Sequence, residues 1–138
     1  MQATDPNMLR GLLMTTMSND NSSRKNAEMS LLSIEGQQGY TLEVLKLVAS
    51  LTSATSPPDI SVRQSAAVHF KNAIKKRWNP RDDDDSTPIP DIDRDAIKAN
   101  LIDLMCSAPK DVQKQLGEAV AIIAKHDFPD KWQNLIAH

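Results

Sequence analysis

Charged residues that could do chemistry crowd into one stretch, HFKNAIKKRWNPRDDDD, at positions 69–85. Basic side chains that could bind phosphate come first, and four consecutive carboxylates that could hold a hard cation follow. The basic residues are Lys71, Lys75, Lys76, Arg77 and Arg81, and the acidic run is Asp82–Asp85. The stretch therefore raises two hypotheses, a polyanion-binding patch and a metal site.

The metal hypothesis fails on spacing. A calcium loop alternates its oxygen ligands and needs a distant bidentate Glu and a Gly at its sharp turn, and Asp82–Asp85 has none of these. The His126–Asp127 pair has no second His and carboxylate at helical spacing. The sequence predicts no metal and no cofactor, and we expect the four Asp to form a solvated loop. Contact of that loop with a basic partner is the alternative.

Catalysis is also disfavoured. Cys106, the single cysteine, could meet one of three histidines in space, but it lies in an apolar run and is expected to be a small core residue. The chain has only four glycines and no glycine-rich phosphate-binding or nucleophile-elbow motif. We therefore expect a binding protein with no catalytic residues.

The charge distribution argues against nucleic acid. Residues 61–81 carry six basic side chains and no acidic one, but residues 82–95 carry seven acidic side chains, and the whole chain has a net charge of −2. The neighbouring acidic run would repel phosphate, and aromatic residues that could stack on bases are few. We also expect no secretory leader, because residues 1–17 lack a basic start and a long apolar run, and no stretch approaches the roughly 20 apolar residues of a membrane span. A protein-binding face is the favoured interpretation.

Hydrophobic periodicity predicts helices throughout. They are expected at residues 6–17, 21–35, 40–52, 59–78, 93–107, 109–125 and 129–137. Asp59 and either Asn21 or Ser22 are the expected N-caps of their helices, and Gly36 is an expected stop. The expected inward residues include Met8, Leu12, Leu13, Ala27, Leu31, Leu32, Leu42, Leu45, Val48, Phe70, Ile74, Trp78, Ile97, Leu101, Val112 and Leu116.

The helices come in pairs, which predicts an all-α, right-handed α-solenoid of HEAT-type antiparallel helix pairs. Repeats are expected at about 5–36, 39–78 and 92–125, with an acidic, proline-rich loop at 79–91. Such repeats run about 40–47 residues, and each buries its apolar face on its neighbour. The helix at 129–137 would begin a fourth pair, so we expect residues 1–138 to open a longer solenoid.

Two motifs carry a family resemblance. Residues 63–78 fit the form R-x-x-A-x-x-x-x-K-N-x-I-x-x-x-W, and residues 127–132 fit D-F-P-x-x-W. With IEGQQGY at 34–40, the chain resembles the N-terminal region of the importin-β (karyopherin-β) family, and is most similar to its CAS-type exportins. The alternatives are an import receptor of the importin-7/8 type and a helical adaptor that binds membrane phosphoinositides through Lys71, Lys75 and Lys76.

The resemblance implies a monomeric receptor that shuttles between nucleus and cytoplasm. Its implied partners are Ran in its GTP form, importin-α as cargo, and nuclear pore proteins. The second helix of each pair would line the inner surface and meet Ran. Carried over by position, the Ran-binding candidates are Gln64, Lys71, Asn72 and Lys75 in the second repeat, Gln113 and Lys114 in the third, and Arg24 and Lys25 in the first. For each, the alternative is a solvated or inter-helix hydrogen-bonding role.

Overall fold

The computed structural model describes residues 6–78 and 88–127, and these residues form six helices without a strand. The helices are α1 (Pro6–Thr15), α2 (Asn21–Ile34), α3 (Tyr40–Ser50), α4 (Pro57–Arg77), α5 (Asp91–Ser107) and α6 (Lys110–Asp127). The prediction of an all-helical chain is confirmed. The predicted helix at 129–137 and the run Asp82–Asp85 lie outside the described residues.

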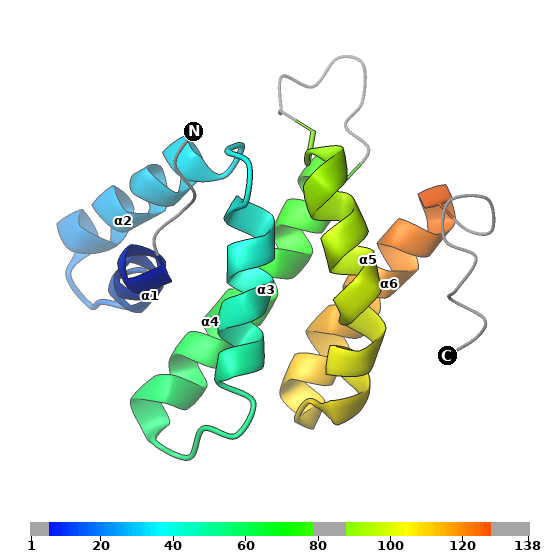
Figure 1. The fold of residues 1–138 in the computed structure, drawn as a ribbon. Coiled ribbons are helices and arrows are strands. Elements are labelled where there is room, and N and C mark those ends of the chain that lie inside the picture. The colour runs from blue at the N-terminus through cyan, green and yellow to red at the C-terminus, as the bar shows by residue number, and fades with distance from the viewer. Residues whose placement is uncertain (1–5, 79–87, 128–138) are drawn as a thin grey trace.

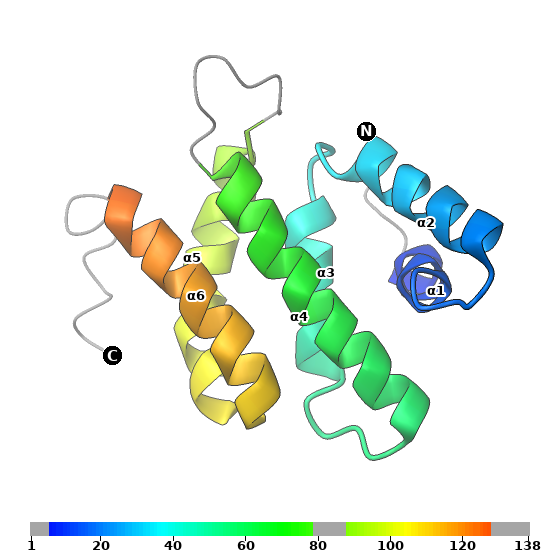
Figure 2. The same ribbon diagram turned by 180° about the vertical axis from the view of Figure 1, so that it is seen from behind.

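Helices α3 to α6 form two layers. Helices α4 and α6 pack side by side on one face, and α3 and α5 pack on the other (Figures 1 and 2). This arrangement puts the second helix of each of these pairs on a common surface, as the solenoid prediction requires. None of the described helices is long and apolar enough to cross a membrane.

The first pair is turned relative to the other two (Figure 1). Helix α1, rather than α2, packs against both α3 and α4. An ion pair between Arg10 of α1 and Asp59 of α4 joins the first two pairs. Helix α2 therefore does not continue the close packing that joins α4 to α6.

The core is a single apolar cluster through all three pairs. Phe70, Ile74 and Trp78 of α4 have no exposed surface, which confirms their predicted inward face. Trp78 is also covered by the guanidinium of Arg94, whose Cζ lies 5.0 Å from the ring centroid.

Several expected core residues are exposed. Met8 and Leu32 are 45% and 57% exposed, while Leu9 takes the inward position in α1. In short helices the apolar stripe is wide enough that a register one residue away fits the pattern equally well. Cys106 is exposed as well, so its prediction as a core residue is wrong; it lies in the last turn of α5, beyond the buried Leu101 and Ile102.

The helix caps also differ from those predicted. Asp20 caps α2 by accepting a hydrogen bond from the Ser23 backbone N–H at 3.0 Å, and Ser56 caps α4, which begins at Pro57. Proline suits a first helical position, so α4 starts two residues before the predicted Asp59 cap. The predicted stop at Gly36 is confirmed, since α2 ends at Ile34 with Glu35 as its C-cap. Gly39, the N-cap of α3, takes the left-handed conformation, with φ of 91°.

A buried polar joint ties the three pairs together where they meet. Arg77 Nε lies 3.2 Å from Glu35 Oε1, joining the end of α4 to the end of α2. Asp93 accepts a hydrogen bond from the Gly39 N–H at 2.7 Å, joining the start of α5 to the start of α3. These two contacts hold the end of α4 against α2 and the start of α5 against α3.

Candidate protein-binding face

Four predicted Ran-binding residues lie on α4, and Gln64 and Lys71 among them face α6. Lys71 Nζ is 3.5 Å from Glu118 Oε2 of α6, so this lysine is half-buried and paired across the two helices. Gln64 is half-buried, while Asn72 and Lys75 are exposed. We call the surface formed by Gln64, Lys71, Lys75, Lys114 and Glu118 the α4–α6 face; Asn72 lies toward α2.

The two α6 candidates occupy different flanks of their helix. Lys114 is exposed on the side opposite the buried Val112 and Leu116, and thus belongs to the α4–α6 face. Gln113 is half-buried and shares its flank with Gly117, one turn later, which faces Met105 of α5. The structure therefore brings Lys114 together with the α4 candidates and leaves Gln113 on the α5 side.

The first-repeat candidates stand apart from the α4–α6 face. Arg24 donates hydrogen bonds to the backbone oxygen of Ser18, at 3.3 Å, and to the side chain of Asn21. Lys25 follows it in sequence, in the N-terminal half of α2, and is exposed. Because the first pair is turned, these positions are not aligned with those on α4 and α6.

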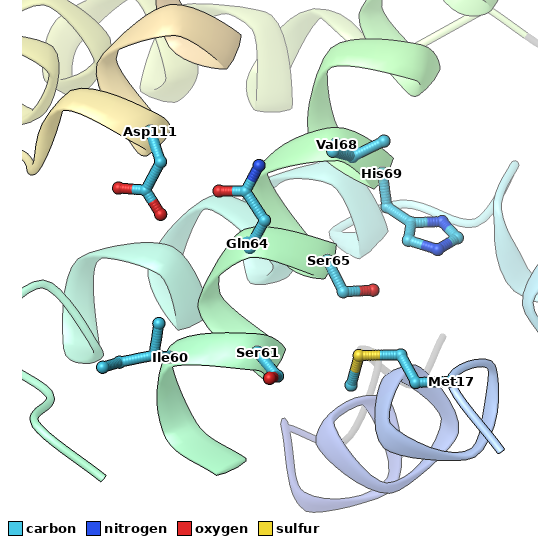
Figure 3. Close-up of a pocket in the computed structure, with 8 residues that line it drawn as sticks. All are labelled: Met17, Ile60, Ser61, Gln64, Ser65, Val68, His69 and Asp111. Atoms are coloured by element: carbon cyan, nitrogen blue, oxygen red, sulfur yellow. The ribbon is translucent and has the colours of Figure 1, made fainter. Parts of the chain in front are cut away.

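A groove of about 500 Å³, here called the α4 groove, runs along α4 between α6 and the turn that follows α1 (Figure 3). Met17, Ile60 and Val68 give it apolar walls. Its polar lining consists of Ser61, Gln64, Ser65, His69 and Asp111. Gln64 and Asp111 lie on facing sides of the gap between α4 and α6, and His69 points toward the Met17 side (Figure 3).

A buried arginine contacts the acidic residue of this groove, and burial affects the histidine. Arg63, which is 6% exposed, places Nη2 3.5 Å from Asp111 Oδ2. Burial lowers the pKa of His69 below its ordinary value of 6.5, although the carboxylates of Glu35 and Glu28 partly oppose this. His69 is therefore neutral at pH 7, and Asp111 is the charged residue among the described ones that line the groove.

A second groove, the α2–α4 cleft, lies on the other side of His69. Glu28 and Glu35 line its α2 wall, and Asn72 and Lys76 line its α4 wall. Asn72 thus faces the first pair while Lys71 faces α6, although the sequence places both on one polar side of α4. A helical period of 3.6 defines a face but not which neighbour covers each edge of it.

Sequence reasoning missed most of the α4 groove. Ser61, Ser65 and Val68 recur with Gln64 at helical spacing, so periodicity alone was a sufficient signal for the α4 wall. Asp111 comes from another helix, and its place here depends on the packing of α4 against α6. No local sequence pattern predicts the contact between α4 and α6 that brings Asp111 to the groove.

The side chains assembled here suit binding rather than reaction chemistry. Within the described residues no group of three or more His, Cys, Asp or Glu side chains could hold a metal ion. The α4–α6 face instead offers amides, lysine ammonium groups and carboxylates around an open groove, which are the groups that pair across a polar protein interface.

Comparison with known proteins decides the family. Residues 27–107 match the Importin-beta N-terminal domain, which is more than half of the chain. The chain belongs to the importin-β N-terminal domain family. This confirms the resemblance drawn from the repeat-helix motif.

Relatives that carry the name Exportin-2 match along nearly all of this chain. The protein of Oreochromis niloticus is 41% identical and that of Homo sapiens 39% identical, each over 99% of this chain. The solved exportin Cse1, in its cargo-free, cytoplasmic state, superimposes with a TM-score of 0.80 at 33% identity over 97% of this chain. The helical-solenoid prediction is thereby confirmed. The chain spans 14% of the length of each of these relatives.

Proposed function

We propose that this chain is the N-terminal part of a nuclear export receptor. In this proposal it binds the small GTPase Ran in its GTP form and, with the rest of the solenoid, carries importin-α from nucleus to cytoplasm. The exportin relatives at about 40% identity support the class of receptor. The α4–α6 face, whose polar side chains project from the packed second helices, is the observation that supports the docking site.

The proposed mechanism is reading of the nucleotide state by surface complementarity. The γ-phosphate of GTP orders the switch segments of a GTPase, and hydrolysis releases them. A rigid pair of packed helices such as α4 and α6 can be complementary to the ordered switch segments. It would make few contacts with the disordered segments of the GDP form, so its affinity for that form would be low. Ran and importin-α would bind with mutual reinforcement, since coupling between two ligands is reciprocal. Hydrolysis in the cytoplasm would then release both, and the receptor would shuttle through the nuclear pore by contacts with pore proteins.

The candidate contacts divide into two groups under this proposal. Asn72, Lys75 and Lys114 are exposed and available to Ran without rearrangement. Lys71 is held by Glu118, and its ammonium group would have to be shared between that carboxylate and the GTPase. Arg24, Lys25 and Gln113 lie off the α4–α6 face and are proposed only as peripheral contacts.

The phosphoinositide alternative is less well supported by the geometry. Lys71 is paired with Glu118, and Lys76 shares the α2–α4 cleft with Glu28 and Glu35. Carboxylates interspersed among the lysines reduce the positive potential that anionic head groups require.

The test uses the full-length receptor that contains this chain. Immobilised receptor is incubated with Ran carrying either a non-hydrolysable GTP analogue or GDP, and retained Ran is quantified. We expect retention of the GTP form and little of the GDP form, increasing when importin-α is added. Equal retention of both forms would refute the proposal, and sedimentation with phosphoinositide vesicles but not with Ran would establish the membrane alternative.

A further inference from the structure

The α4 groove offers hydrogen-bond acceptors within apolar walls. None of the described residues that line it is a lysine or arginine, although Lys71 and Lys75 lie on the adjoining α4–α6 face. Its walls near Met17, Ile60 and Val68 suit an aliphatic chain. A side chain that enters would therefore need an apolar stem and a donor-rich end.

Gln64 supplies an acceptor that has no donor among the described residues. Its Oε1 atom is buried and accepts no hydrogen bond from the described residues. Buried polar atoms are nearly always paired, because an unmade hydrogen bond is destabilising. Because Oε1 is closed to solvent, the half-buried Gln64 side chain would have to turn into the groove for a partner's donor to supply the missing bond.

Asp111 supplies the negative charge at the same end. Its carboxylate is 39% exposed, and its nearest cation, Arg63 Nη2, lies 3.5 Å away on the buried side. That distance is longer than a well-formed charge-assisted hydrogen bond of about 2.7–2.9 Å. The exposed side of the carboxylate thus retains acceptor capacity toward the groove.

We propose that the α4 groove receives an arginine side chain from the protein that docks on the α4–α6 face. The arginine stem would lie against Met17, Ile60 and Val68, and its guanidinium would donate to Gln64 and Asp111. Arginine fits because it joins an aliphatic stem to a planar fork of five donors, which can serve two acceptors at once. Neutral His69 does not repel it. This inference rests on the proposed function, in which the docking protein is Ran in its GTP form.

Variants of the full-length receptor test the groove by their affinity for Ran loaded with a non-hydrolysable GTP analogue. We expect Asp111→Asn to weaken binding about thirtyfold, the lower end of the range for removing one partner of an interfacial charge pair. Gln64→Leu should weaken it about tenfold, the lower end of the range for a hydrogen bond to a charged group. Gln64→Glu, which presents an acceptor in either orientation of the head group, should bind at least as tightly as the parent. Asp95→Asn removes an exposed carboxylate of α5, outside the groove, and should leave the affinity unchanged.

A second pair of variants tests whether the volume of the α4 groove, rather than the charge of its lining, is needed for binding. Ser65→Phe should fill the groove and weaken binding, while Ser65→Ala at the same position should not. Thermal unfolding monitored by circular dichroism confirms that each variant is folded.

The arginine itself is found from the partner side. Each exposed arginine of Ran is replaced by methionine, which keeps an apolar stem, and is measured against parent and Asp111→Asn receptors. One replacement should weaken binding to the parent receptor but not weaken it further in Asp111→Asn, which is the signature of direct coupling.

Two outcomes are distinguishable. If the receptor selects Ran-GTP but Asp111→Asn and Ser65→Phe behave like their controls, or if every arginine replacement is additive with Asp111→Asn, the groove inference is overturned and the proposed function stands. If the parent receptor does not distinguish the GTP form from the GDP form, the proposed function fails and the groove inference falls with it.

Discussion

Arg77 anchors the polar joint between the first two pairs. Its guanidinium is nearly buried, and Nε lies 3.2 Å from Glu35 Oε1, itself a largely buried carboxylate. A buried charge without its partner is far more destabilising than an intact pair is stabilising, because desolvation is then uncompensated. The backbone oxygen of Arg77 also accepts a hydrogen bond from the Ile89 N–H at 3.1 Å, which anchors the chain after the acidic loop.

Replacing Arg77 by alanine should therefore lower the free energy of unfolding by about 3–5 kcal/mol. Equilibrium unfolding in urea measures this. Lys75→Ala, two residues earlier and exposed, is the matched control and should change stability by less than about 0.5 kcal/mol. The double variant Arg77→Leu with Glu35→Leu should recover part of the loss. A loss equal to that of Lys75→Ala would show that the joint contributes nothing.

His69 gives stability a pH dependence of known sign. Burial lowers its pKa in the folded protein below 6.5, so the unfolded chain takes up the proton first as the pH falls. The contribution of neutral His69 to the free energy of unfolding is therefore fully present above pH 6.5. It is lost as the pH falls below 6.5 toward the lower pKa of His69 in the folded protein.

The matched variant is His69→Gln, which keeps a polar side chain but cannot titrate. Urea unfolding between pH 5 and 7.5 should show the parent losing stability relative to His69→Gln as the pH falls. If the difference between the two proteins grew in favour of the parent at low pH, Glu28 and Glu35 would outweigh burial and the sign would be reversed.

At the scale of the element, α6 is held by a stripe that repeats at helical spacing. Val112, Leu116, Ala119 and Ile123 have no exposed surface. Leu116→Ala should lower the free energy of unfolding by about 2–5 kcal/mol, through lost burial and the cavity left behind. Leu32→Ala, at the exposed apolar position in α2, should change it by less than about 0.5 kcal/mol. Urea unfolding of both variants checks the assignment, and similar losses would contradict it.

The comparison of α4 with α2 shows what sequence can and cannot predict. The inward positions of Phe70 and Ile74 in α4, and of Trp78 at its C-cap, were predictable because a long helix repeats its stripe enough times to fix the register. In α2 the stripe is shorter, and Leu31 is buried while its neighbour Leu32 is exposed. The caps at Asp20 and Ser56 depend on where the backbone leaves the helical conformation, which residue type alone does not determine.

The candidate face was predictable in part for the same reason. The outward positions of α4 follow from its period, and Lys114 follows from that of α6. The pairing of Lys71 with Glu118, and the place of Asp111 beside Gln64, arise from contacts between helices about 50 residues apart in sequence. The turned first pair, which removes Arg24 and Lys25 from the face, has no local signature either.

At the scale of the whole molecule, α4 and α6 form the proposed binding surface, and α3 and α5 support it from the other layer. The polar joint at Arg77 and Asp93 fixes the pairs at one end, while α2 leaves the side of α4 open as a cleft. A GTPase that docks on this surface would contact second helices from at least two repeats at once. Such a footprint depends on how the repeats are stacked, so the stability of the joint and the affinity for Ran should be linked.

The most direct test is hydrogen–deuterium exchange of the full-length receptor with and without Ran. In the presence of Ran carrying a non-hydrolysable GTP analogue, amides in α4 and α6 should exchange more slowly, with little change in α3 and α5. Ran-GDP at the same concentration should leave all four helices unchanged. Protection confined to α3 and α5, or equal protection by both forms of Ran, would contradict the assignment of the α4–α6 face as the docking site.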